Sequence, residues 1–181
     1  MPGRKPAPAT GWRPSSNKPL TPATLIIAYG NPLRGDDGLG RRAAEMLRER
    51  AFPGITILAL HQLAPELAED LSRAALAVFI DAREGGVPGE WRAEAVLPAP
   101  ETPRPFTHQV SPATLLTAAR TLYGHAPEAL LYSMGGESFD YGEGLSAQVA
   151  AALPAMLEAI AERVLNGRAA SPASGPGRSE R

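Results

Sequence analysis

The chain of 181 residues contains no cysteine, which excludes disulfide bonds, thiolate metal ligands and cysteine nucleophiles together. Any metal ion must therefore be bound by oxygen atoms and imidazole nitrogens. An excess of positive charge is also lacking, because 18 Lys and Arg residues face 19 Asp and Glu residues, which gives a formal net charge of −1. No basic stripe interleaved with aromatic residues is present either, so we expect neither nucleic acid nor an anionic membrane as a partner.

Long hydrophobic runs are missing as well. No stretch approaches the roughly 20 apolar residues of a membrane span, and the basic residues near the start are not followed by the apolar core of a secretory signal. We therefore expect a cytoplasmic protein without a membrane partner. Residues 1–22 and 167–181 are rich in Pro, Ser, Gly and basic residues, a composition typical of disordered tails. This leaves a single predicted domain over residues 23–166.

Within that domain, short apolar runs alternate with amphipathic segments, which predicts an α/β fold with a mostly parallel sheet between helices. The predicted strands are Thr24–Tyr29, Ile55–Leu60, Leu76–Ile80, Trp91–Leu97 and Ala129–Met134, with the fourth nearer an edge. Helices are expected after Asp37 and over Pro65–Arg73, Ser111–Leu122 and Ser146–Leu165, the last with a potential kink at Pro154.

Ligands of open α/β sheets bind beyond the carboxyl ends of the strands, so the residues at those ends are the first candidates for a site. The glycine-rich loop after the first strand carries the adjacent acids Asp36 and Asp37, and Asp81 follows the third strand. His108 lies in a proline-rich loop before the helix at Ser111, which returns it to the same edge. Two carboxylates and an imidazole suit a borderline divalent ion such as Zn²⁺ or Ni²⁺, which can polarise a carbonyl or activate water.

Each of these residues also has a purely structural interpretation. Asp36 or Asp37 can cap the helix that begins near Leu39, Asp81 can be a turn acid, and His108 can be a solvated loop residue. The glycine-rich loop is a poor nucleotide site, because it matches neither a Walker motif nor GxGxxG and its acids repel phosphate. A GxSxG serine elbow is absent, whereas an aspartic-protease pair of Asp37 and Asp81 remains open as a variant.

The segment Ile26–Gly40, IIAYGNPLRGDDGLG, resembles the N-terminal signature of the hydrogenase maturation proteases, which trim the C-terminus of the [NiFe]-hydrogenase large subunit. Further resemblances follow in order at Val78–Ala82, at Thr107–His108 with the helix after it, and at Gly136–Ser146. Together they extend over roughly Leu25–Leu165. The resemblance implies a twisted, five-stranded sheet in a three-layer sandwich.

The resemblance also implies roles for individual residues. Asp37, Asp81 and His108 fall on the residues of the family that contact metal and take part in catalysis. In this family the three ligands recognise nickel already installed in the immature hydrogenase, so that metal insertion precedes cleavage. Asn31 falls on the Gly-Asn of the signature and is expected to shape the loop or contact substrate.

One segment departs from the common pattern of the family. Where many members have Asp-Gly-Gly-Thr after the second strand, this chain has Leu60-His61-Gln62-Leu63. This variant is similar to the proteases that serve bidirectional, NAD-coupled hydrogenases, so we expect that type of large subunit as partner. His61 and Gln62 are candidates for specificity, and His61 alternatively competes with His108 as a ligand or packs at the entry of the following helix.

The expected function is therefore removal of a C-terminal extension from a nickel-loaded large-subunit precursor by cleavage of one peptide bond. Nickel is supplied by the precursor, and neither a nucleotide nor a permanently bound cofactor is expected. Specificity is expected to come mainly from the metal and the shape of the precursor. One alternative is a noncatalytic, nickel-sensing assembly chaperone on the same fold. Another is a metal-independent or differently specific peptidase, which cuts a metal-free precursor.

Overall fold

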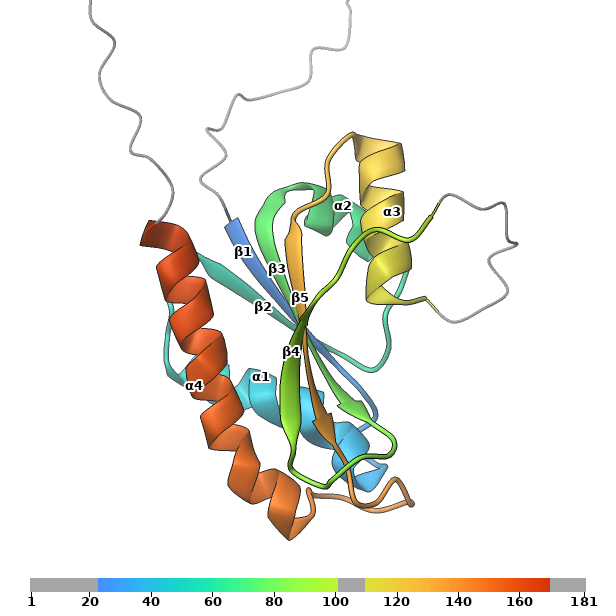
Figure 1. The fold of residues 1–181 in the computed structure, drawn as a ribbon, viewed down its shortest axis with the longest axis vertical. Helices are drawn as coiled ribbons and strands as arrows, with labels where there is room; N and C mark the ends of the chain where they lie inside the picture. The colour runs from blue at the N-terminus through green and yellow to red at the C-terminus, as the bar shows by residue number, and fades with distance from the viewer. Residues whose placement is uncertain (1–22, 101–109, 170–181) are drawn as a thin grey trace, which may run out of the picture.

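The computed structural model describes residues 23–100 and 110–169, which form a five-stranded sheet with the strand order β2-β1-β3-β5-β4 (Figure 1). The parallel strands are β1 (Ala23–Tyr29), β2 (Ile55–Leu60), β3 (Ala74–Arg83) and β5 (Glu128–Gly135), and the antiparallel edge strand is β4 (Trp91–Ala95). The helices are the 3₁₀ helix η1 (Gly35–Gly38), α1 (Leu39–Glu49), α2 (Leu67–Ser72), α3 (Pro112–Tyr123) and α4 (Ala147–Ala169).

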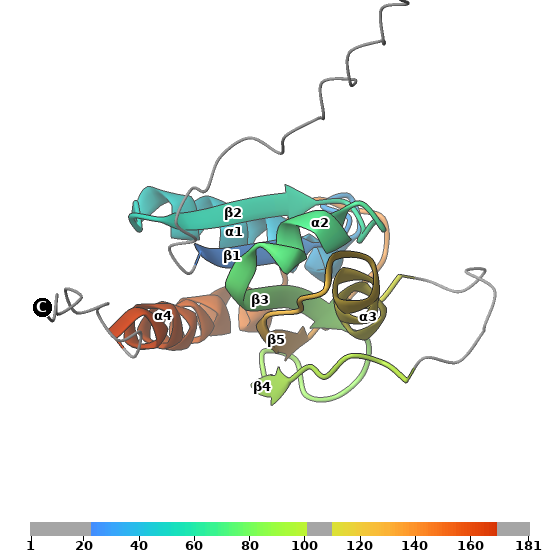
Figure 2. The ribbon, with the colours of Figure 1, turned by 90° about the horizontal axis from the view of Figure 1, so that it is seen from above.

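The helices form two layers, one on each side of the sheet. Helices α1 and α4 pack on one face, and α2 and α3 pack on the other, as Figures 1 and 2 show. Strand β1 lies inside the sheet between β2 and β3, so its side chains are buried on both faces: Ile26 lies in the cluster with α1 and α4, and Ile27 in the cluster with α2 and α3. This explains the uninterrupted apolar run of β1. The predicted α/β sandwich with a mostly parallel sheet is confirmed.

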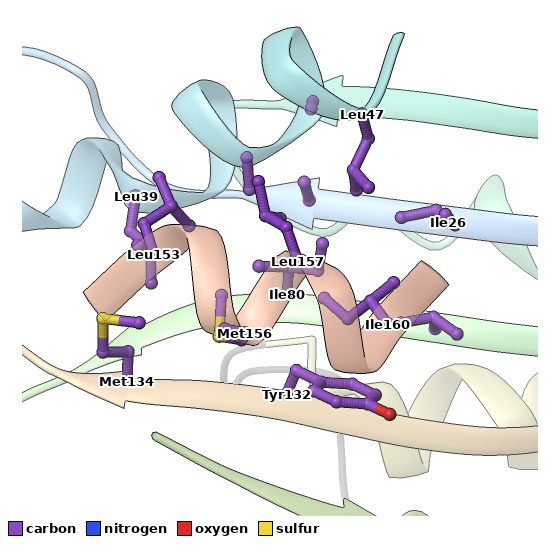
Figure 3. Close-up of a cluster of buried hydrophobic side chains, with 14 of the residues drawn as sticks. Ile26, Leu39, Leu47, Ile80, Tyr132, Met134, Leu153, Met156, Leu157 and Ile160 are labelled. Carbon is purple, nitrogen blue, oxygen red and sulfur yellow. The ribbon is translucent and has the colours of Figure 1, made fainter. Parts of the chain in front are cut away.

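Helix α4 supplies a large part of the hydrophobic cluster that lies between the sheet and helices α1 and α4. Figure 3 shows Leu153, Met156, Leu157 and Ile160 pointing from this helix toward the sheet, where Met134 of β5 lies beneath them. All five side chains are almost fully buried. Burial of side chains of this size stabilises a fold by about 1.5–3 kcal/mol each, so α4 anchors the chain against the central strands.

Helix α1 approaches the sheet closely because it begins with a glycine in its first turn. A Cβ atom at Gly40 would lie only 2.4 Å from the carbonyl oxygen of Tyr29, the last residue of β1. The helix therefore rests almost directly on the backbone of β1. This close packing holds η1, which immediately precedes α1, against the carboxyl end of the strand.

Some predicted bounds differ from the structure. Strand β3 continues to Arg83, because it pairs with β5 as far as the couple Arg83–Gly135, so Asp81 lies inside the strand. Helix α4 runs to Ala169, three residues past the predicted end of the domain. Leu122 is 70% exposed near the end of α3, which continues one residue past the predicted end, to Tyr123. Among the described helices, none combines the length and the apolar character that crossing a membrane requires.

Candidate functional site

The candidate site lies where the connections of the sheet change direction. From β1 the chain passes through α1 to β2, the neighbour on one side, whereas β3 pairs with β1 on the other side. Ligands of doubly wound sheets bind at this kind of switch point, outside the carboxyl ends of the strands. Asp37 follows β1 and Asp81 lies near the end of β3, so the structure brings two of the sequence-predicted residues to this point.

The loop after β1 holds Asp37 in place. The backbone N–H of Asn31 donates a hydrogen bond of 2.9 Å to Oδ2 of Asp37, and the Asn31 side chain accepts one of 3.0 Å from the N–H of Leu33. Gly30 has φ +136°, and a Cβ atom there would lie 2.0 Å from the carbonyl oxygen of Asp37. The Gly-Asn pair therefore allows the loop to fold back on Asp37, which gives Asn31 a loop-shaping position.

Asp81 lies beside Tyr29 on the α2/α3 face of the sheet. The register of β1 and β3 pairs Ala28 with Ile80, so the next residue of each strand is also a neighbour. The Tyr29 hydroxyl donates a hydrogen bond to the Asp81 carboxylate. Burial, followed by the negative charge and the hydrogen bond of Asp81, raises the pKa of the Tyr29 phenol, which therefore stays a donor at neutral pH.

Asp81 itself titrates far above an ordinary aspartate. Burial is the largest cause and raises the pKa of Asp81 from 3.8 to about 6. The hydrogen bond from Tyr29 and one from the backbone of Ala82 work in the opposite direction, whereas the negative charge of Asp37 raises the pKa further. The two carboxylates are therefore close enough to repel each other, an arrangement that a cation placed between them relieves.

This shift predicts a pH dependence of stability. A carboxyl group whose folded pKa is raised stabilises the fold fully below its unfolded pKa of 3.8, and loses this contribution as the pH rises through about 6. Between pH 7.5 and pH 5 the unfolding free energy should rise by about 1 kcal/mol through Asp81. Urea unfolding of wild type and Asp81→Asn at both pH values measures this, because the other titrating groups are common to both proteins and cancel in the comparison. Equal pH slopes in the two proteins contradict the prediction.

Asp36 has a different environment from its neighbour Asp37. Its side chain is fully buried, and its carboxylate accepts three backbone hydrogen bonds, from Glu137 at 2.7 Å, Ser138 at 3.1 Å and Ser146 at 2.7 Å. Burial alone works to raise the pKa of Asp36, but these hydrogen bonds outweigh it and hold the pKa below its usual value. An ionised Asp36 thus fastens the loop after β1 to the segment between β5 and α4.

The remaining predicted residues have different positions. His61 and Gln62 are exposed directly after β2, next to the loop of Asp37, because the N–H of Gly30 bonds to the carbonyl of Leu60 at 3.1 Å. His108 lies outside the described residues. Within the ranges 23–100 and 110–169, no three His, Cys, Asp or Glu side chains are arranged to hold a metal ion. The pair of Asp37 and Asp81 can nevertheless offer carboxylate oxygens to a cation that arrives with another molecule.

Sequence reasoning missed Tyr29 as a contact of Asp81. The signal was available, because Tyr29 ends a predicted buried strand next to the strand of Asp81, and a buried phenol normally finds a hydrogen-bond partner. It also offered Asp36 or Asp37 as a cap of the following helix, without identifying the partners of the Asp36 carboxylate. Those partners lie more than a hundred residues away along the chain.

No protein-family model and no curated protein matches this chain. Several solved structures, however, match it. The chain is 26% identical to the hydrogenase maturating endopeptidase HybD from E. coli, with a TM-score of 0.66 over 80% of this chain and 93% of that one. It is also 26% identical to the [NiFe] hydrogenase maturation protease HybD from Thermococcus kodakarensis, with a TM-score of 0.60 over 78% and 98% of the two chains.

A third structure shares the fold at lower identity. The [NiFe] hydrogenase maturation protease HycI from Thermococcus kodakarensis is 23% identical, with a TM-score of 0.64 over 80% of this chain and 94% of that one. The structural neighbours of the chain are thus hydrogenase maturation proteases, and the chain spans nearly their whole length.

Proposed function

We propose that this protein is an endopeptidase that removes the C-terminal extension of a [NiFe]-hydrogenase large-subunit precursor. The observation that carries the proposal is the pair of Asp37 and Asp81 at the switch point of a fold shared with hydrogenase maturation endopeptidases. A fold alone supports many functions, so the assignment depends on this site.

The nickel ion of the precursor is the proposed recognition element, and it belongs to the substrate. The two mutually repelling carboxylates favour a divalent cation between them, which supports this part of the proposal. His108 remains the sequence-based candidate for the third ligand. In this arrangement the nickel ion aligns the precursor with the site, and the backbone contacts of Asp37 keep its carboxylate oriented before the precursor arrives.

The hydrolytic step requires a water molecule and a group that accepts its proton. Asp37 is the candidate base, since a carboxylate within reach of water can take up a proton during attack on a peptide carbonyl. Asp81, with its raised pKa, is suited to exchange a proton near neutral pH. This property is also compatible with a mechanism of the aspartic-protease type, in which Asp37 and Asp81 act as a pair. In both mechanisms the peptide bond to be cut lies beside Asp37 and Asp81.

The type of hydrogenase is proposed from the residues after β2. Leu63 is buried and holds the segment on the core, whereas His61 and Gln62 are exposed at the edge that also carries Asp37. Side chains in that position can contact the precursor. Their similarity to the variant in proteases of bidirectional, NAD-coupled hydrogenases supports a large subunit of that class as the partner.

Incubation of the purified protein with nickel-loaded and nickel-free precursor, followed by intact-mass analysis, tests the proposal. We expect loss of a C-terminal peptide from the nickel-loaded precursor and at least about 100-fold slower cleavage without nickel, because the metal positions the substrate. Equal cleavage of both samples contradicts nickel recognition and indicates the metal-independent peptidase. Stable binding without any mass change contradicts the endopeptidase and indicates the assembly chaperone, which no observation on this structure favours.

A further inference from the structure

A cavity of about 520 Å³ lies next to the loop of Asp37. Gly35 and Gly38, the two glycines on either side of Asp36 and Asp37, both form part of its wall. The cavity continues from there along the first half of α1 to Arg41 and Arg42, and Leu145 of the segment before α4 also forms part of its wall. The cavity therefore borders the loop that carries Asp37, on the side of the sheet that α1 and α4 cover.

The cavity has an apolar side. Pro32 and Leu33 contribute it from the loop after β1, and Leu145 and Ala150 contribute it from the region where α4 begins. Leu33 is 41% exposed, so its side chain still offers apolar surface to a ligand. Apolar walls with a few polar groups, around a volume of roughly 300–1,000 Å³, are typical of sites that bind small ligands or short peptide segments.

The cavity is also held in shape before any ligand binds. The N–H of Gly142 donates to the carbonyl of Leu33 at 2.9 Å, and the N–H of Gly35 donates to the carbonyl of Gly142 at 2.8 Å. Arg34 adds a hydrogen bond of 3.2 Å to the carbonyl of Phe139. In Figure 1 the segment before α4 accordingly runs beside the start of α1. A wall fixed in this way loses little entropy when a peptide binds.

Two arginines of α1, Arg41 and Arg42, line the cavity. Both form ion pairs with the single carboxylate of Glu45: Nε of Arg41 lies 3.3 Å from Oε1, and Nη1 of Arg42 lies 3.4 Å from Oε2. The two arginine side chains are 63% and 55% exposed. Exposed pairs of this kind contribute little, so either guanidinium can turn to another carboxylate. Glu45 and Glu143 also form part of the wall, and Arg41 and Arg42 are the positive groups among the residues that line the cavity.

From this arrangement we propose that the cavity binds the C-terminal extension of the precursor, with an apolar side chain against Leu33 and a carboxylate at Arg41 and Arg42. The inference rests on the proposed function, since it places the extension beside the peptide bond to be cut. The size of the cavity favours a short peptide segment over a folded domain. The extension is also the part of the precursor that ends in a free carboxylate.

The test measures peptide binding and cleavage separately. A fluorescent peptide with the C-terminal sequence of the candidate precursor is titrated with wild type, with Leu33→Ser, with the double variant Arg41→Gln/Arg42→Gln, and with Leu122→Ser as control. Leu122 is exposed on α3, on the other face of the sheet. We expect about tenfold weaker peptide binding and about tenfold higher KM for the first two variants, with a nearly unchanged kcat. The control should match wild type.

The source of the carboxylate is resolved with two modified peptides. Weaker binding of a C-terminally amidated peptide identifies the terminal carboxylate, and weaker binding of a peptide with neutralised acidic side chains identifies a side chain. If wild type cleaves the precursor but the Leu33 and arginine variants bind and cut like the control, the cavity proposal is wrong and the endopeptidase stands. If wild type binds the peptide through these residues yet cuts no precursor, the endopeptidase is wrong and the peptide site stands.

Discussion

Asp37→Asn should reduce processing of the nickel-loaded precursor by at least about 100-fold, because the amide can neither take up a proton nor share a divalent cation as a carboxylate does. The loop should keep its shape. The amide oxygen of asparagine can still accept the hydrogen bond from the N–H of Asn31, which is the contact that holds the side chain now. Initial cleavage rates, determined by intact mass at saturating precursor, measure the effect.

The same assay applied to Asp81→Asn should give a loss of similar size. This variant should also be more stable than wild type at neutral pH, by up to about 3 kcal/mol, since it removes a carboxylate whose burial opposes ionisation. A gain in stability together with a loss of activity separates a functional role from a structural one. Wild-type rates in either variant remove that residue from the proposed machinery, and His108→Ala extends the series to the third predicted ligand.

Asp36→Asn should have the opposite effect to Asp81→Asn. It should lose about 3 kcal/mol of unfolding free energy, while the folded fraction still cuts the precursor. Three backbone N–H groups converge on the Asp36 carboxylate, and an amide nitrogen in place of one oxygen leaves at least one buried donor without an acceptor. Urea unfolding at pH 7 measures the loss. Asp140→Asn, an exposed acid of the opposing segment, serves as the matched control and should change stability by less than about 0.5 kcal/mol.

The acid limb of the stability curve gives a second measure of Asp36. Its pKa is lowered in the fold, so its contribution is present above the unfolded value of 3.8 and disappears as the pH falls through its folded pKa. Wild type should therefore lose more stability below about pH 4 than Asp36→Asn does. A variant with the stability and acid sensitivity of wild type contradicts the role of the three hydrogen bonds.

The strands were predictable because their signals are local. β1 is a β-branched run with neighbours on both faces. The predicted start of a helix at Ser111 is confirmed by a capping box in which Ser111 and Thr114 exchange hydrogen bonds. The end of β3 was not predictable in this way. It depends on pairing with β5, a partner about fifty residues further along the chain.

The site was predictable only in part for the same reason. Strand ends identify Asp37 and Asp81 as candidates, and the topology then brings them together. Nothing near Asp36 in the sequence distinguishes it from Asp37, since the difference arises from donors at Glu137, Ser138 and Ser146. The cavity likewise combines residues from the beginning and the end of the domain, so no local sequence pattern predicts it.

The hydrogen bonds of Asp36 also set an order of events during synthesis. Asp36 is separated by 101 residues from Glu137 and by 110 from Ser146, so the first loop of the domain stays unfastened until almost the last helix has left the ribosome. Contacts between such distant residues form late, after the entropy of closing a long loop has been overcome. An unfinished chain can therefore contain Asp37 and Asp81 before the three hydrogen bonds of Asp36 have formed, and the proposed hydrolytic activity is expected only of the nearly complete domain.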